Sequence, residues 1–203
     1  MPFPLAVIRR RFETVLDRWL RLYEQLRFPL ELFFSVHNSP GGLLEYRFLS
    51  LVQAAESYHR ERVRSDELAP KEFKKRLVLL RSRTPKPYRS WLNERLHNRM
   101  SLRDRLDALI VRTGPIFHAL VPDQKKAVDA IVKTRNGLSH GQLGFRSAFE
   151  GDYGLFRLIE VVSLLLQEQL LRELGFSRLQ AGAAIERNWK YAYAMQLVPK
   201  GNP

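Results

Sequence analysis

Apolar residues recur at alternating steps of three and four positions along much of this chain, and this spacing limits the folds that it can adopt. The clearest run comprises Leu5, Ile8, Phe12, Val15, Trp19, Leu22 and Leu26. Such spacing aligns side chains along one side of an α-helix. The sequence shows no comparable alternation of apolar and polar residues that would indicate strands, and no internal repeat. We therefore predict an all-α fold in which about seven helices pack as a bundle.

Glycine, proline and capping residues divide the rest of the chain into further helices. The expected helices are Leu43–Arg64, Asp123 to Gly141, Leu155–Leu171 and Ser177–Met195, with shorter ones on either side of Thr84–Pro87. A loop containing Glu150, Gly151 and Asp152 precedes the most apolar helix, whose apolar stripe is too wide to cover a single neighbour. We expect that helix to be central. Trp19, Trp91 and Trp189 lie at helical positions, which favours core packing over base stacking.

The composition fits one globular domain. Of the 203 residues, 45% are hydrophobic and 27% are charged, which is enough apolar material for a core. We assign residues 1–198 to a single helical domain and residues 199–203 to a flexible tail. The absence of cysteine excludes disulfide scaffolds, thiolate metal sites and cysteine nucleophiles. Because Arg157, Glu160 and Glu168 interrupt the most apolar run, we expect no membrane span and a cytoplasmic protein.

Positive charge is concentrated in one part of the chain. The whole sequence carries +13 with histidines neutral, and residues 71–112 contribute +9 of this. Arginine outnumbers lysine 25 to 9, and arginine is suited to holding phosphates and stacking on bases. A solvated helix face with salt bridges would also explain the charge run. Nucleic acid is the foremost candidate partner, and Arg103, Arg105 and Arg112 are candidate contacts to its backbone.

The segment Lys133-Thr134-Arg135-Asn136-Gly137-Leu138-Ser139-His140-Gly141 holds the side chains best suited to chemistry. Arg135 continues the four-three row of Gln124, Val128 and Ile131, where an inward apolar residue is expected. Burying an unpartnered guanidinium is costly, so an arginine there indicates a polar pocket, an ion pair such as one with Glu160, or an interface open to an anion. Asn136 and His140 are four residues apart and share one helix face.

His140 is expected in the last helical turn, just before Gly141, where the negative end of the helix favours the imidazolium. A histidine near neutrality beside a phosphate-holding arginine suits acid–base cleavage of RNA, with the 2′-hydroxyl as nucleophile. A capping histidine with a structural ion pair would explain the same residues. A similar spacing, Arg112 to His118, contains Gly-Pro and indicates a turn. The sequence lacks the familiar metal and phosphate-loop motifs, so we expect no metal or cofactor.

Arg135-Asn136-Gly137-Leu138-Ser139-His140 resembles the RNxxxH signature of the HEPN superfamily, helical-bundle proteins many of which are metal-independent ribonucleases. Four segments also resemble, in order, the helical C-terminal part of ApeA-type anti-phage defence proteins: FETVLDRWLRLYEQLRFPLELFF, YRFLSLVQAAESYHR, SLRDRLDALIVRTG and KTRNGLSHG. The resemblance covers most of the chain and implies a HEPN-like helical bundle. ApeA-type proteins usually carry a non-helical region ahead of the bundle, whereas this chain begins with a helix.

By this resemblance, Arg135 contacts the phosphate or transition state, Asn136 orients its neighbours, and His140 is the acid–base group. The resemblance implies a metal-independent endoribonuclease of bacterial anti-phage defence that cleaves RNA, with tRNA a candidate, at a homodimer interface where two motifs face each other. The alternatives are a catalytically inactive helical module that binds RNA or protein, and the toxin of a toxin–antitoxin pair. An additional N-terminal domain or an antitoxin is a further partner consistent with the resemblance.

Overall fold

The computed structural model describes residues 5–38, 41–63, 66–141 and 154–196, and every regular element in them is a helix. In chain order these are α1 (Leu5–Ile8), the 3-10 helix η1 (Arg9–Arg11), α2 (Phe12–Gln25), α3 (Arg27–Asn38), α4 (Leu44–Arg62), α5 (Pro70–Arg83), the 3-10 helix η2 (Lys86–Tyr88), α6 (Arg89–Arg95), α7 (Leu102–Val111), α8 (Pro115–Leu120), α9 (Gln124–Ser139), α10 (Leu155–Glu173), α11 (Arg178–Glu186) and α12 (Trp189–Gln196). The all-α prediction is confirmed. The expected loop at 150–152 and the tail at 199–203 lie outside the described residues.

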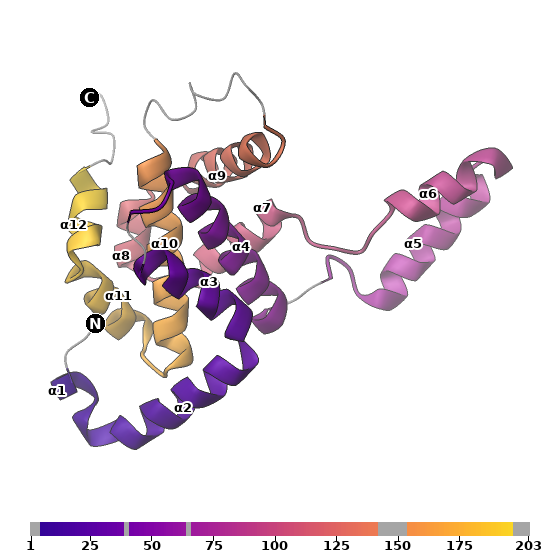
Figure 1. Cartoon of the computed structure of the whole chain (residues 1–203). Coiled ribbons are helices and arrows are strands. Elements are labelled where there is room, and N and C mark those ends of the chain that lie inside the picture. The colour runs from indigo at the N-terminus through magenta and orange to yellow at the C-terminus, as the bar shows by residue number, and fades with distance from the viewer. Residues whose placement is uncertain (1–4, 39–40, 64–65, 142–153, 197–203) are drawn as a thin grey trace.

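The helix α10 runs through the middle of the bundle, as its wide apolar stripe predicted (Figure 1). Between Leu155 and Leu171 every residue except Phe156 is buried. The helices α4, α7, α8, α9, α11 and α12 all pack against it. Because the middle helix is surrounded, its polar side chains must find partners inside the protein.

Four of the buried polar side chains on α10 hold turns of the surrounding chain. Glu168 accepts a hydrogen bond from the Gly114 backbone N–H (2.6 Å), just before α8. The side chain of Gln169 donates to the Leu109 carbonyl near the end of α7 (3.2 Å). The remaining two bonds run from Arg157 to the Leu120 carbonyl (3.3 Å) and from Asn188 to Gln167 (3.1 Å). The central helix therefore fixes the ends of its neighbours as well as supplying the core.

The helix number exceeds the expected seven in the described residues, because two expected helices are each divided and short helices such as α8 were not expected. The expected helix at Leu5–Leu26 is interrupted by η1, where the Arg11 guanidinium donates to the Gly175 carbonyl (3.0 Å) and stacks over the Phe176 ring at 4.7 Å. The expected helix at Ser177–Met195 is broken at Asn188, whose side chain turns inward to Gln167. Both breaks are made by contacts with distant residues, which local spacing does not encode.

Other boundaries follow the sequence signals. Ser101 forms a capping box with Asp104 at the start of α7, and Ser177 forms one with Gln180 at the start of α11. Pro115 is the first residue of α8, a position where its missing N–H costs nothing. The short stretch Thr84–Pro87 separates α5 from α6 as predicted.

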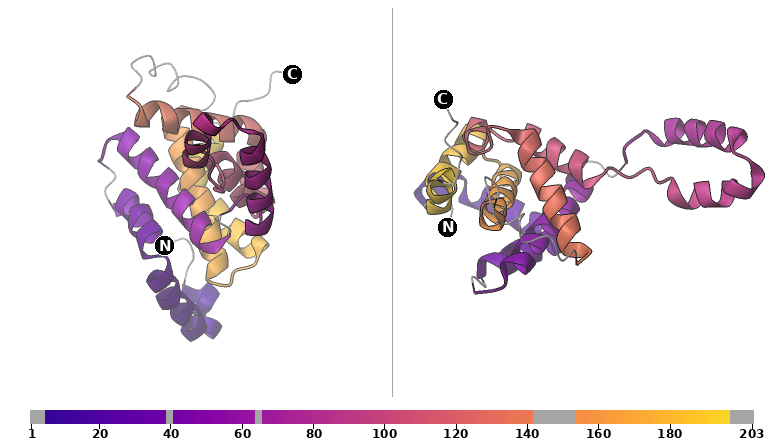
Figure 2. Two further views of the ribbon diagram at one scale, coloured as in Figure 1. Left: turned by 90° about the vertical axis from the view of Figure 1, so that its right-hand side faces the viewer. Right: turned by 90° about the horizontal axis from the view of Figure 1, so that it is seen from above.

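The helices α5 and α6 stand away from the bundle, as Figure 2 shows most clearly in the view from above. We call residues 70–95 the arm. Asn98 joins the two chain segments at the base of the arm, because its side chain accepts from the Leu68 N–H (2.9 Å) and donates to the Leu68 carbonyl (2.8 Å). Among the described residues, no helix is long and apolar enough to cross a membrane.

Glu168 provides a test of the central helix. Burial raises the pKa of its carboxyl above the ordinary value, although Arg172 and Arg178 partly oppose this. The folded chain therefore binds this proton more tightly than the unfolded chain, so the free energy of unfolding falls as pH rises from the unfolded pKa to the folded one. In Glu168→Gln the acceptor for Gly114 remains and no proton is lost, so we expect the stability of the variant relative to wild type to increase across that range.

Urea unfolding at a series of pH values from about 4 to 8 measures this difference. Glu45→Gln is the matched control, because Glu45 is exposed on α4. If the stability of Glu168→Gln relative to wild type stays constant or falls with rising pH, the assignment is contradicted.

Candidate functional site

The helix α9 carries the Arg-Asn-x-x-x-His segment at its C-terminal end. Asp123 caps its start by accepting from the Lys126 N–H (2.9 Å), as the Val-Pro-Asp sequence predicted. At the other end His140 is the C-cap residue, and Gly141 follows with a φ of +60°, a conformation that glycine adopts without strain. The predicted position of His140 before a helix-ending glycine is confirmed. The sequence offers Gly144 as a second helix-ending glycine, and this residue lies outside the described residues.

The buried side of α9 is rotated relative to the row expected from the sequence. Its buried residues are Ala127, Val128, Ile131, Thr134 and Gly137. Arg135 is half-buried at the edge of this side and does not occupy a fully inward position. The expectation of an inward guanidinium is therefore wrong in its detail, because Thr134 and Gly137 occupy the buried places. The guanidinium keeps access to the surface.

Arg135, Asn136 and His140 come together at the exposed end of α9. Arg135 Nη1 donates to Asn136 Oδ1 (3.2 Å), and the Asn136 carbonyl accepts from the His140 backbone N–H (3.0 Å). The residues Asn136 and His140 are both exposed. A guanidinium oriented by an amide, with an imidazole one helical turn away, can receive a phosphate from solvent.

Arg103 lies on the same side of α9 as the segment. It forms an ion pair with Asp129, which joins the first turn of α7 to α9. Asp129 precedes Asn136 by seven residues, two helical turns, and so shares its helix face. Both Arg103 and Asp129 are partly exposed, with side-chain exposures of 42% and 47%. Arg103 is thus held on the face of α9 that also carries Asn136.

Arg105 is placed differently from the expectation of a backbone contact. It is only 4% exposed, and its guanidinium lies 3.3 Å from His59 Nδ1 and donates to the Met100 carbonyl (3.2 Å). Burial lowers the pKa of this guanidinium, although the charge of Glu56 partly opposes the shift. An arginine held in this way joins α7 to α4 and cannot reach a phosphate without leaving its place. We do not retain it among the substrate contacts.

Arg112 is half-buried at the end of α7 and faces a different cluster. Its charge acts on Tyr58, whose hydroxyl donates to Glu173 (2.8 Å). Burial raises the pKa of that hydroxyl, with the Glu173 carboxylate contributing. The three candidate arginines are therefore not brought together. Only Arg103 lies beside the segment on α9.

Two tryptophans depart from the core prediction. Trp19 packs edge-on against Phe34 with ring centroids 5.8 Å apart, as expected. Trp91 on α6 and Trp189 on α12 are 59% and 70% exposed, so the prediction is wrong for both. Their neighbours gave a signal, since each lies in a short helix flanked by charged residues rather than in a long apolar stripe.

A surface hollow lies away from the segment on α9. It lies where α2 meets α3 beside α4, and Glu24, Arg27 and Arg60 are among its lining residues. Within the part of the chain that the structure describes, no three His, Asp or Glu side chains gather as metal ligands. The segment on α9 is an open surface, as a site completed by a second molecule would be.

Replacing Arg105 and Arg103 of α7 separately by alanine distinguishes a buried structural arginine from an arginine near the surface. We expect Arg105→Ala to lower the free energy of unfolding by about 1–3 kcal/mol, because it removes buried hydrogen bonds. Arg103→Ala should cost less than about 1 kcal/mol, since it removes an exposed ion pair. Urea unfolding measures both. Equal costs for the two variants would show that the burial of Arg105 does not matter to the fold.

One comparison with known proteins gives a match. The sequence model of the family described as Apea-like HEPN matches residues 49–180, which is more than half of the chain. The match includes most of α4, the arm, and all of α7, α8, α9 and α10. Neither a curated protein nor a solved structure matches the chain significantly. With its all-α bundle and its Arg-Asn-x-x-x-His segment on α9, the chain belongs to the Apea-like HEPN family.

Proposed function

We propose that this chain is a metal-independent endoribonuclease of bacterial anti-phage defence, with tRNA among its candidate substrates. HEPN domains generally carry ribonuclease activity, and the Apea-like family is linked to defence. The observation that carries the proposal is the exposed grouping of Arg135, Asn136 and His140 at the end of α9. A purely structural role would not require an amide-oriented guanidinium and an imidazole on an open surface.

The chemistry follows from these side chains. A neutral His140 imidazole accepts the proton of the RNA 2′-hydroxyl, and the 2′-oxygen bonds to the neighbouring phosphorus while the bond from phosphorus to the 5′-oxygen breaks. A protonated imidazole supplies the proton that the departing 5′-oxygen needs. Arg135 balances the charge that develops on the phosphate oxygens. The products are a 2′,3′-cyclic phosphate end and a 5′-hydroxyl end.

The two proton transfers favour a homodimer. One imidazole cannot accept a proton and donate another at the same moment, so a single copy of His140 serves only one of these roles. Two copies of the chain that meet with their α9 ends facing each other would place a base and an acid on either side of the scissile phosphate. The exposed position of the segment leaves room for such an arrangement.

The first test removes the imidazole. We expect His140→Ala to reduce RNA cleavage at least about 100-fold, because both proton transfers depend on it. Wild-type protein should cleave in EDTA and leave 2′,3′-cyclic phosphate and 5′-hydroxyl ends, which end-mapping identifies. His97→Ala is the matched control, since His97 is also exposed and lies at the base of the arm.

Cleavage that persists in His140→Ala, or that requires added magnesium, contradicts the proposal. Salt-sensitive RNA binding with no product ends at any protein concentration favours the inactive binding module instead. The basic, exposed arm is the observation that supports that second function.

The second test concerns the dimer. The chain has a mass of 23.8 kDa, and light scattering should give about twice this value for the active protein. The activity per molecule should fall on dilution below the dimer dissociation constant, because each separated chain then holds only one of the two His140 side chains that the site needs. A protein that stays monomeric at every concentration and keeps its full activity per molecule would refute the shared site.

A further inference from the structure

The described helices of the arm contribute no side chain to the buried core of the protein. Within α5, η2 and α6 no residue is buried, and apolar side chains such as Phe73, Leu77 and Leu92 are only partly buried. Residues 70–95 contain nine Lys or Arg and two Glu, so the arm carries +7 and the rest of the chain +6. More than half of the net charge therefore stands on a rod only two helices thick (Figures 1 and 2).

Lysines line the outer side of α5. Lys71, Lys74 and Lys75 surround Val78, and all four side chains are exposed. Their spacing of three, four and seven residues keeps them on one helix face, away from Phe73 and Leu77. The acid on this helix, Glu72, is bonded to Arg76 (3.0 Å). The lysine ammonium groups are free to meet phosphates.

An aromatic stripe continues the arm along α6. Trp91 and Arg95 are four residues apart on α6, and Tyr88, the N-cap residue of α6, precedes Trp91 by three, so the three side chains follow one side of the arm. Tyr88 is 62% exposed and Trp91 59%, although burial of these rings would be favourable. Two exposed aromatic rings beside an arginine form a surface on which unpaired bases stack.

We propose that the arm is a binding site for single-stranded RNA, in which the α5 lysines hold backbone phosphates and the Tyr88–Trp91–Arg95 stripe stacks with unpaired bases. This inference rests on the proposed function, since the arm would bind RNA, the substrate class of the proposed nuclease. It adds a site that stands apart from the segment on α9. A single-stranded region, rather than a duplex, is the partner that uses both the charge and the rings.

The charges and the distribution of apolar residues favour RNA over the other partners. A second copy of the chain is itself strongly basic, so its surface would repel the arm rather than attract it. A membrane-surface helix needs a continuous apolar face opposite its charges, whereas the exposed apolar residues of α5, Val78, Leu79 and Leu80, are consecutive and therefore point to different sides of the helix. An RNA strand meets both requirements, negative charge and unpaired aromatic bases.

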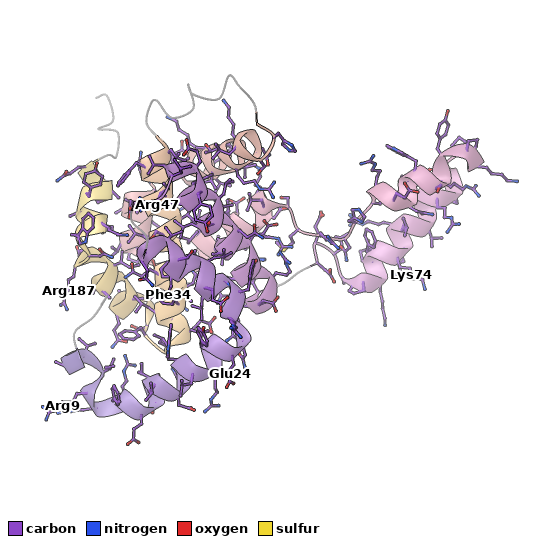
Figure 3. The ribbon with its side chains drawn as sticks, in the orientation of Figure 1. Arg9, Glu24, Phe34, Arg47, Lys74 and Arg187 are labelled. Atoms are coloured by element: carbon purple, nitrogen blue, oxygen red, sulfur yellow. The ribbon has the colours of Figure 1, made fainter. Side chains whose placement is uncertain are left out.

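The first experiment reverses charge at two places. Binding of the full chain to a short, unstructured 2′-O-methyl RNA, which lacks the hydroxyl needed for cleavage, is measured by fluorescence anisotropy. We expect Lys74→Glu with Lys75→Glu to weaken binding at least about tenfold and to lower the salt dependence of the affinity. Arg9→Glu with Arg10→Glu is the matched control, because it changes the charge equally at the opposite end of the molecule (Figure 3).

The second experiment removes the rings. We expect Tyr88→Ala with Trp91→Ala to weaken binding to the single strand about tenfold and to leave binding to a duplex of the same sequence nearly unchanged. Trp189→Ala is the control for loss of an exposed ring, since Trp189 is 70% exposed on α12. Circular dichroism confirms that each variant keeps its helices.

Equal weakening by the arm and control charge reversals would overturn the proposal, because net charge alone would then explain binding. Ring removal without effect on the single strand would also overturn it. A change in oligomeric mass instead of RNA affinity would assign the arm to a second copy, and lost binding to anionic vesicles instead of RNA would assign it to a membrane surface. Because the RNA cannot be cleaved, these results do not depend on whether the chain is a nuclease.

Discussion

The burial of α10 on all sides is the constraint on which the rest of the structure depends. A surrounded helix supplies much of the core, and it also places Arg157, Gln167, Glu168 and Gln169 where water cannot reach them. Their hydrogen bonds end on the turns before α8, after α8, near the end of α7 and between α11 and α12. The same interactions that satisfy the central helix therefore set the positions of its neighbours. The candidate site inherits its position from this arrangement, because α7 is held by Gln169 and α9 by its packing on α7 and α10.

The local signals in the sequence predicted most of the helices, and the long-range contacts account for the remainder. Ser101, Pro115, Asp123 and Gly141 act within a few residues of their own positions, so their effects on helix ends could be read directly. The breaks at η1 and Asn188 could not, because they depend on Gly175 and Gln167 from other parts of the chain. Apolar spacing indicates which side of a helix is buried. It gives no information about a hydrogen bond to a distant carbonyl, such as the bond from Arg11 to Gly175 at η1.

In the candidate site too, the features set by local sequence were predicted, whereas those set by packing and by other helices were not. The spacing of Asn136 and His140 placed them on one helix face in advance, because residues four positions apart are neighbours on a helix. The contact of Arg135 with the adjacent Asn136 depends on the reach of the arginine side chain, which the structure shows. The depth of Arg135 was predicted too far inward, since the buried side of α9 is set by the small residues Thr134 and Gly137. Arg105 was misplaced because its partner His59 lies on another helix, and basic composition does not distinguish an arginine in a buried hydrogen bond from one on the surface.

The sequence locates the positive charge, but only the fold shows which of these charges stand on the arm and which lie in the bundle. In the sequence, residues 71–112 form one basic run. In the structure the part up to Arg95 stands on the arm, while the part from Ser101 onward is built into the bundle, where Arg105 is buried and Arg103 is paired with Asp129. Charges on a solvated rod retain their field and their access to a polyanion, whereas charges in hydrogen bonds to the bundle are largely used by the protein itself. The two parts of one charge run therefore differ in how much charge they present to a partner.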